Sequence, residues 1–239
     1  MYNYDRFVDN LKNINISVDN TQIEKFTLFY NILIEWNKKM NLTAITDFEE
    51  VVEKHFIDSI SIHQFYPLNR SLSVLDMGTG AGFPGIPLKI IFPELQIVLV
   101  DSLKKRVSFL EEIIDRLQLK NIKAIHSRAE DLAGDAAYRE NFDLTVSRAV
   151  ANLSLLCEYC IPFVKRGGNF ISYKSNQIED ELKEAEKAIR ILGGSIKEVQ
   201  KFHLSGTEAG RSFIIIDKIG KTPVHYPRRA GIPSKKPIK

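Results

Sequence analysis

Three glycines at alternating positions, Gly78, Gly80 and Gly82, follow an apolar run that ends near Asp76. Glycine has no Cβ and tolerates positive φ, so such a loop lets the backbone approach a nucleotide-like ligand closely. A dinucleotide fingerprint would place its third glycine one position later, where this chain has Phe83. The spacing therefore disfavours a dinucleotide. The alternative reading of the loop is a tight turn between a strand and a helix.

Polar groups at two further strand ends can complete a nucleoside site. Asp101 ends a second apolar run about twenty residues after the loop, where a carboxylate can accept hydrogen bonds from both ribose hydroxyls of an adenosine. Its alternative role is to cap the helix that follows. Ala129 and Glu130 follow a third short strand and can face an adenine edge, although they equally suit the first turn of a helix.

The pattern Asp-x-Gly-x-Gly-x-Gly resembles the first motif of class I S-adenosylmethionine (SAM) methyltransferases, which usually place catalytic residues at the end of the fourth strand. That strand ends here in Ser147 and Arg148, with neither an Asp/Asn-Pro-Pro-aromatic motif nor a cysteine nucleophile. Guanine N7 carries a free lone pair, so its methylation needs alignment and charge management but no base. We therefore assign no catalytic residue. Arg148 is expected to position the cofactor carboxylate or an RNA phosphate, or else to pair with a surface acid.

Other chemistry-bearing residues are more ambiguous. His55 and Asp58 lie three apart on one helix face, as either a structural pair or a substrate-facing pair. Lys174 lies at the end of the fifth strand. Cys157 and Cys160 lack the second pair of ligands that a zinc site needs, so we interpret them as small residues on a buried helix face and expect no metal.

The elements that must position these groups alternate between strand and helix after residue 72. Strands are predicted at 72–77, 95–101, 122–126, 142–147, 168–174, 195–203 and 212–219, and helices at about 84–92, 103–117, 152–164 and 177–192. Alternating units predict an α/β, Rossmann-like fold with a seven-stranded, mostly parallel sheet. The link 204–211 is too short for a helical crossover, so the last two strands should form an antiparallel hairpin.

Three segments are expected: a helical extension over 1–70, the sheet domain over 71–220, and a tail over 221–239. The chain has 239 residues and net charge +3, of which the tail carries +6. Four prolines favour extended backbone there, so the tail is either an arm that contacts phosphates or a solvated terminus. Apolar runs are shorter than a membrane span and no secretory signal is visible. We expect a cytoplasmic monomer that contacts no membrane.

Several motifs together resemble one family over nearly the whole chain. They are Asn41-Leu42-Thr43, His55 to Ser59, the glycine loop with Phe83-Pro84-Gly85, Val100-Asp101-Ser102, Arg128-Ala129-Glu130, Ser147-Arg148-Ala149 and Tyr226 to Pro233. This set is similar to the bacterial 16S rRNA guanine-N7 methyltransferases (RsmG, formerly glucose-inhibited division protein B). The Gly-Phe-Pro-Gly extension and the Tyr-Pro-Arg-Arg-x-Gly-x-Pro tail are its most specific parts.

The resemblance implies SAM-dependent methylation of N7 of one guanosine in the 530 loop of 16S rRNA, within the small ribosomal subunit or an assembly intermediate. The cofactor contacts it implies are Gly78, Phe83, Ala129, Glu130 and Arg148. To these the strand-end geometry adds Gly80, Gly82 and Asp101. Candidates for RNA handling are His55, Asp58, Lys174, Arg228 and Arg229.

Three alternatives remain open. A NAD-dependent oxidoreductase can share the sheet, although the glycine spacing and the terminal hairpin disfavour it. A non-enzymatic RNA-binding protein can retain the fold, although the intact loop with Asp76 and Asp101 disfavours loss of the cofactor. The same chemistry can also act on another RNA, such as tRNA or an mRNA cap, which only the family resemblance disfavours.

Overall fold

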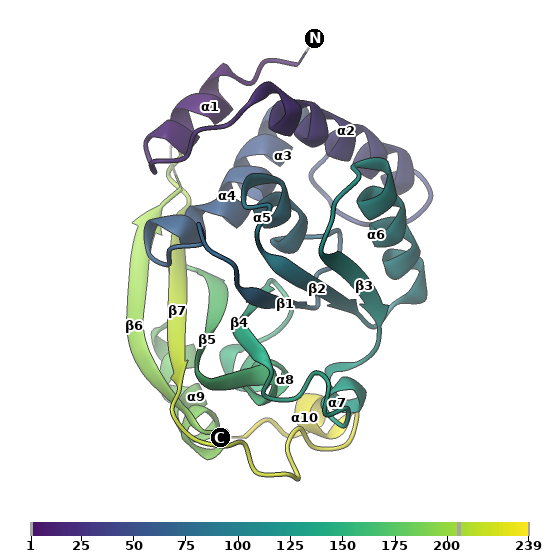
Figure 1. The fold of residues 1–239 in the computed structure, drawn as a ribbon. Helices are drawn as coiled ribbons and strands as arrows, with labels where there is room; N and C mark the ends of the chain where they lie inside the picture. Colours follow the sequence, from purple (N-terminus) through teal and green to yellow (C-terminus); the bar gives the residue numbers. More distant parts are fainter. Residues whose placement is uncertain (1, 205–206, 239) are drawn as a thin grey trace.

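Seven strands form one sheet in the computed structural model, which describes residues 2–204 and 207–238. Met1, Ser205, Gly206 and Lys239 lie outside the described residues. The order across the sheet is β3-β2-β1-β4-β5-β7-β6 (Figure 1). The strands are β1 (Ser73–Met77), β2 (Gln96–Asp101), β3 (Ile122–His126), β4 (Phe142–Arg148), β5 (Val164–Ser175), β6 (Gly194–His203) and β7 (Gly210–Lys218).

The pairing directions confirm the predicted sheet. The strands from β3 to β5 pair in parallel, whereas β7 runs antiparallel to both of its neighbours, β5 and β6. The link between β6 and β7 is short, as an antiparallel hairpin allows. The reversal in strand order on either side of β1 places the carboxyl ends of β1, β2 and β4 at one edge, where α/β sheets bind ligands.

Both faces of the sheet are buried, because side chains along each strand alternate between two cores. In β2, Leu99 packs in one core and Val100 in the other, and Phe213 and Ile214 of β7 divide in the same way. Helices α2, α5 and α6 cover one face, while α8 and α9 cover the other (Figure 1). The helices of these layers are α2 (Asn20–Asn37), α5 (Gly85–Ile91), α6 (Lys104–Arg116), α8 (Leu153–Cys160) and α9 (Glu179–Ile191).

The helix boundaries follow local capping chemistry. Asp19 accepts from the Gln22 amide at 2.8 Å, and the Gln22 side chain accepts from the Asp19 amide at 3.0 Å, which closes a capping box before α2. Asp47 caps the next helix, α3 (Phe48–Val51), by accepting from the Glu50 amide at 3.1 Å. Gly193, with φ +85°, follows the last turn of α9 and ends it, because glycine adopts this left-handed conformation readily.

The N-terminal helices share a core with the sheet. Phe29 lies between Phe56 and Phe83, with ring centroids 5.5 and 5.3 Å apart, so the helical extension touches the glycine loop directly.

The division of the chain near residues 70 and 220 stays a prediction. No helix within residues 2–204 and 207–238 is long and apolar enough to span a membrane. The remaining short helices are α1 (Asp5–Lys12), α3 (Phe48–Val51), α4 (Asp58–Ile60), η2 (Ser61–Gln64), α7 (Ala129–Leu132) and η3 (Ile161–Phe163).

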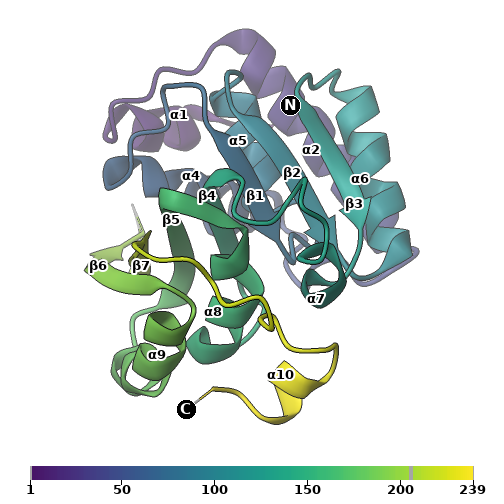
Figure 2. The same ribbon diagram turned by 60° about the horizontal axis from the view of Figure 1, so that its bottom comes forward.

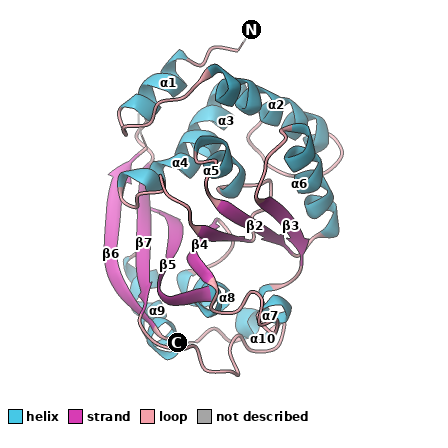
Figure 3. Cartoon of the chain, viewed as in Figure 1, coloured by secondary structure: helices cyan, strands magenta, loops and turns pink. Residues whose placement is uncertain are grey.

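Three local features differ from the sequence predictions. The helix after Asp47 contains a π-helical segment, η1 (Val52–Ile57), for which the sequence carries no signal. Pro162 lies in the 3-10 turn that ends α8, so β5 begins at Val164, four residues earlier than expected. The tail includes a short helix, α10 (Ile232–Lys235), because a proline in a first helical turn is compatible with helix (Figure 3).

Candidate functional site

A cavity of about 560 Å³ lies where the carboxyl ends of β1, β2 and β4 meet. This volume is within the range of small-molecule sites. Seven of the eight predicted cofactor residues line it: Gly78, Gly80, Phe83, Asp101, Ala129, Glu130 and Arg148. Gly82 does not line the cavity, and it instead packs toward Ile86 and Leu110 within the loop-to-helix turn.

The glycine loop is fixed from below by Asp76. This carboxylate is fully buried, and its Oδ2 accepts from the Thr79 hydroxyl at 2.6 Å and from the Gly85 amide at 2.8 Å. Burial raises the pKa of Asp76 to about 6. A Cβ at Gly85 would lie 2.3 Å from Leu99 Cδ2 and 2.8 Å from Asp76 Oδ2, so a larger residue there would disturb this support. Gly80 has φ +59° and open space where a Cβ would project, so its backbone faces the open cavity.

Asp101 both lines the cavity and organises its own surroundings. Its Oδ2 accepts from the Gly80 amide at 3.0 Å and from Arg106 Nη1 at 3.4 Å, while Oδ1 accepts from the Leu103 amide at 2.9 Å. These donors occupy about three of the roughly four acceptor positions of a carboxylate. Asp101 thus orders the backbone just before α6, whose N-cap is Leu103. It keeps about one free acceptor position, fewer than the two that both ribose hydroxyls would need, and its contact with a cofactor stays a prediction.

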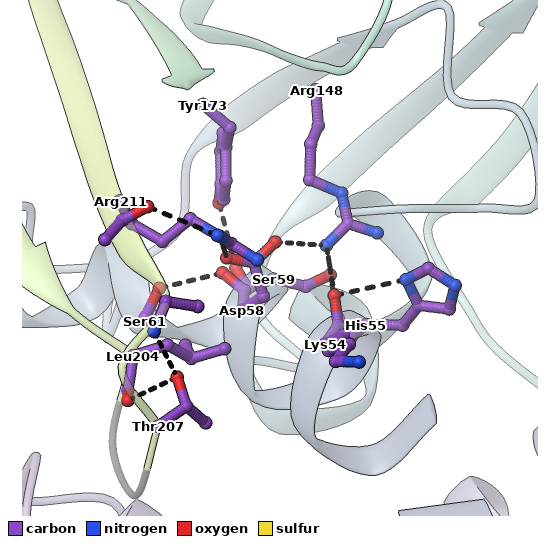
Figure 4. Close-up of polar contacts among 12 residues, drawn as sticks. Lys54, His55, Asp58, Ser59, Ser61, Arg148, Tyr173, Leu204, Thr207 and Arg211 are labelled. Atoms are coloured by element: carbon purple, nitrogen blue, oxygen red, sulfur yellow. Dashed lines mark hydrogen bonds and ion pairs between the residues drawn. The ribbon is translucent and has the colours of Figure 1, made fainter. Parts of the chain in front are cut away.

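Arg148 is held by a buried ion pair. Its Nη1 lies 2.8 Å from Asp58 Oδ2, and its guanidinium lies 5.0 Å from the Phe83 ring centroid. The other Asp58 oxygen accepts from Arg211 Nε at 2.8 Å, so one carboxylate joins α4, β4 and β7 (Figure 4). The partner of Arg148 is thus a buried acid on the helical extension rather than a surface acid. The second partner, Arg211, was not expected.

His55 completes this side of the cavity as a neutral ring. Burial, followed by the charge of Arg148, lowers its pKa to about 4. Nδ1 lies 3.1 Å from the Lys54 carbonyl and must carry the proton, so Nε2 accepts from the Thr43 hydroxyl at 2.8 Å. The ring stacks on Phe83 with centroids 4.6 Å apart. We call Thr43, His55, Phe83 and Arg148 the π-helix wall.

A second group of lining residues, which we call the tail wall, consists of Glu130, Tyr159, Gly231 and Ser234. Glu130 lies in the first turn of α7, and Tyr159 extends from α8. Burial and the neighbouring Glu130 raise the pKa of Tyr159 to about 12, so its hydroxyl stays protonated. Gly231 and Ser234 come from the C-terminal tail, which the sequence did not predict at this cavity.

A family model described as rRNA small subunit methyltransferase G (GidB) matches residues 22–209. The chain belongs to this family. The ribosomal RNA small subunit methyltransferase G of Lachnoclostridium phytofermentans is 50% identical over 232 residues, covering 97% of this chain and 96% of that protein. That of Acetivibrio thermocellus is 50% identical over 231 residues, covering 97% and 95%.

The expected class I methyltransferase fold is also confirmed. The crystal structure of M. jannaschii TYW2 in complex with AdoMet matches with a TM-score of 0.54 at 14% identity, covering 74% of this chain and 80% of that chain. Likeness at this identity concerns the fold alone. Together with membership of the rRNA small subunit methyltransferase G family, it implies a cofactor of the SAM type.

The predicted RNA residues of this family member are not gathered in one place. His55 lines the cavity, whereas Asp58 is occupied by two arginines. Lys174 Nζ donates to the Ala151 carbonyl at 2.7 Å and pairs with Glu181 at 2.6 Å, outside the cavity lining. Arg228 is bound to Glu158, and Arg229 has no side-chain hydrogen bond or ion pair to residues 2–204 or 207–238.

Sequence reasoning missed several lining residues. Thr43 was noted only within a motif, and nothing marked Tyr159, Gly231 or Ser234 as part of a ligand site. The tail motif was a usable signal, because a specific pattern of prolines and a glycine in a basic segment indicates a folded structure more than a solvated end. Cys157 and Cys160 are both buried with free thiols, as interpreted from the sequence.

Proposed function

We propose that this chain transfers a methyl group from SAM to N7 of one guanosine in the 530 loop of 16S rRNA, in the small ribosomal subunit or an assembly intermediate. One observation carries the proposal: the glycine loop, Asp101 and Glu130 line the same cavity as a fixed arginine and a neutral histidine. The family assignment supports the rRNA substrate, because its relatives are named ribosomal RNA small subunit methyltransferase G.

The residues present fit a SAM-type cofactor. The open backbone at Gly80 and the cradle formed with Gly78 and Phe83 suit the amino-acid part, whose carboxylate would pair with Arg148. Asp101 retains an acceptor for a ribose hydroxyl. Ala129 and Glu130 would face the adenine edge. When bound, SAM supplies an electrophilic methyl group on a sulfonium.

The chain itself supplies alignment and electrostatics. Asp58 and the Phe83 ring fix the Arg148 guanidinium, so its position is set before any ligand binds. His55 stays neutral at pH 7 and therefore adds no further positive charge to a wall that already carries the Arg148 guanidinium. The described lining residues include no cysteine or lysine, which suits attack by a guanine N7 lone pair that needs no nucleophile or base.

The test uses small ribosomal subunits and naked 16S rRNA from a strain that lacks the gene. Each is incubated with the chain and methyl-labelled SAM, and 7-methylguanosine is mapped by chemical cleavage. We expect label at a single guanosine of the 530 loop in at least one substrate. Arg148→Ala should abolish the label, whereas Arg166→Ala, an exposed arginine on β5, should retain it.

Two results would contradict the proposal in different ways. If neither substrate is labelled although S-adenosylhomocysteine binds measurably, the cofactor assignment stands but the 16S rRNA target is wrong. Another RNA, first tRNA, would then be tested as the substrate. No binding of S-adenosylhomocysteine or SAM by calorimetry would refute the cofactor itself, and tight NADH binding would then support an oxidoreductase.

A further inference from the structure

The C-terminal tail is fastened to one face of α8 at two buried points. Glu158 is fully buried, and its Oε1 accepts from the Arg228 amide at 2.7 Å, while Oε2 lies 2.6 Å from Arg228 Nη2. Ser154, four residues earlier and therefore on the same helix face, donates to the Ile238 carbonyl. Two buried polar groups of one helix thus depend on the tail for their hydrogen bonds.

This fastening makes the tail part of the folded body. All hydrogen bonds to the Glu158 carboxylate within residues 2–204 and 207–238 come from Arg228. A buried carboxylate that loses its cation is strongly unfavourable, so α8 and the tail must dock together. Upstream, Arg139 donates to the carbonyls of Thr222 and Tyr226 at 3.1 and 2.8 Å, which fixes the start of the tail.

The segment between the two fastenings reaches the cavity. Gly231 and Ser234 line it together with Glu130 and Tyr159. A Cβ at Gly231 would meet nothing within 4 Å. Figure 2 shows the tail crossing in front of α8 before it forms α10. Tyr159 directly follows Glu158, so α8 places a fastening residue and a cavity residue side by side.

We propose that residues 228–236 form a strap that builds the outer wall of the nucleoside end of the cofactor site, with Glu158 and Arg228 as its positioning residues. The inference rests on the SAM-type cofactor of the proposed function and adds a role for the tail besides RNA contact. Because coupling between two sites is reciprocal, a bound nucleoside stabilises the docked strap, and loosening the strap weakens nucleoside binding by the same factor.

The first test uses the unmodified chain and limited trypsin digestion. The strap offers cleavable bonds after Arg228, Arg229 and Lys235, and Lys12 on α1 provides a control bond far from the cavity. With saturating S-adenosylhomocysteine, cleavage in the strap should slow by about fivefold or more, the lower end of typical site coupling. Cleavage after Lys12 should not change. Equal slowing at both places would indicate global stabilisation and overturn the strap.

The second test loosens the strap without leaving a buried charge. Glu158→Gln keeps the side-chain shape and leaves Arg228, which is partly exposed, without a buried anion. Glu186→Gln on the exposed face of α9 is the matched control. Calorimetry should show S-adenosylhomocysteine binding weakened by about fivefold or more for Glu158→Gln only. The KM for SAM should rise by the same factor, while the KM for RNA should change by less, because Arg229 is the only strap residue expected to contact RNA.

The outcomes separate the strap from the function on which it rests. Wild-type affinity in Glu158→Gln, or a parallel loss of SAM and RNA binding, would overturn the strap but leave the methyltransferase proposal standing. Failure of the unmodified chain to bind S-adenosylhomocysteine would refute the cofactor, and the strap with it.

Discussion

The two walls of the cavity are both held by a buried ion pair, but the two ion pairs act differently. Each is fixed by a buried carboxylate bound to arginine: Asp58 with Arg148 and Arg211 behind the π-helix wall, and Glu158 with Arg228 behind the tail wall. In the first, the arginine itself reaches the cavity. In the second, the arginine stays outside and the backbone that follows it lines the cavity. A buried ion pair can therefore aim a charged side chain or hold a chain segment.

The largest effect should come from removing the anion behind the π-helix wall. Asp58→Ala leaves two arginines without their buried partner, and such losses cost about 3–5 kcal/mol of unfolding free energy. Urea unfolding measures this cost, and methyl transfer should fall below detection because Arg148 is no longer held. Asp9→Ala, which breaks an exposed pair with Lys12, should cost less than about 1 kcal/mol. Equal costs would mean that Asp58 does not position Arg148.

The next effect distinguishes the π-helix wall from the tail wall, because His55 makes the stability of the fold depend on pH. His55 has a folded pKa of about 4, below the ordinary histidine value, so the unfolded chain binds more protons between pH 6.5 and 4. This residue therefore destabilises the fold as pH falls through that window, by about 3 kcal/mol in total. Asp76, with a pKa raised to about 6, acts in the opposite direction, because its folded form gains the proton first.

Replacement of His55 by asparagine exposes this balance. From pH 7 to pH 4.5, the unfolding free energy of His55→Asn should improve relative to the unmodified chain by about 2 to 3 kcal/mol, measured by urea titration at each pH. His225→Asn, at an exposed position of the tail, is the control and should follow the unmodified chain. If both variants follow it, His55 is not held neutral by its wall.

Residues that share one sheet edge could be predicted from the sequence. Asp101, Glu130 and Arg148 each follow or end a strand of a parallel sheet, so the topology alone brings them to the glycine loop. In the same way, the periodicity of apolar residues predicts the strands, and the short link before β7 predicts that β6 and β7 form a hairpin. In these cases the relevant signal lies within a few residues of the feature.

The carboxylates behind the walls could not be predicted, because their burial depends on distant segments. Asp58 meets Arg148 and Arg211 across 90 and 153 residues, and Glu158 meets Arg228 across 70. A glutamate within a helix indicates a solvated face unless the covering segment is known. A basic, proline-containing tail indicates a solvated or RNA-bound arm for the same reason. In each case the interacting residue lies far away in the sequence, so only the tertiary structure identifies it.

A smaller effect is expected from a comparison of two glycines, Gly80 in the cavity lining and Gly167 outside it. Gly80 and Gly167 both have positive φ, +59° and +84°, and open space where a Cβ would project. Alanine at either position should therefore cost about 1 kcal/mol of stability through the same backbone strain. Only Gly80→Ala places a methyl group in the cavity, so it alone should weaken S-adenosylhomocysteine binding, by about tenfold or more in calorimetry. Comparable weakening by Gly167→Ala would mean that the loop faces no ligand.

The smallest expected effect distinguishes the roles of the neighbouring residues Arg228 and Arg229 in the tail. Arg228 is occupied by Glu158, whereas the Arg229 side chain has no hydrogen bond or ion pair within the described chain and can reach a phosphate. Arg229→Ala should leave S-adenosylhomocysteine affinity unchanged and weaken binding of the small subunit by about 1 kcal/mol or less. The slope of log affinity against log salt should fall by about 0.7 to 0.9, the value for one lost phosphate contact. Lys187→Ala, an exposed cation on α9, should leave the slope unchanged. If Arg229→Ala also leaves it unchanged, the tail serves the cofactor site alone, and the RNA must be held by cations elsewhere on the surface.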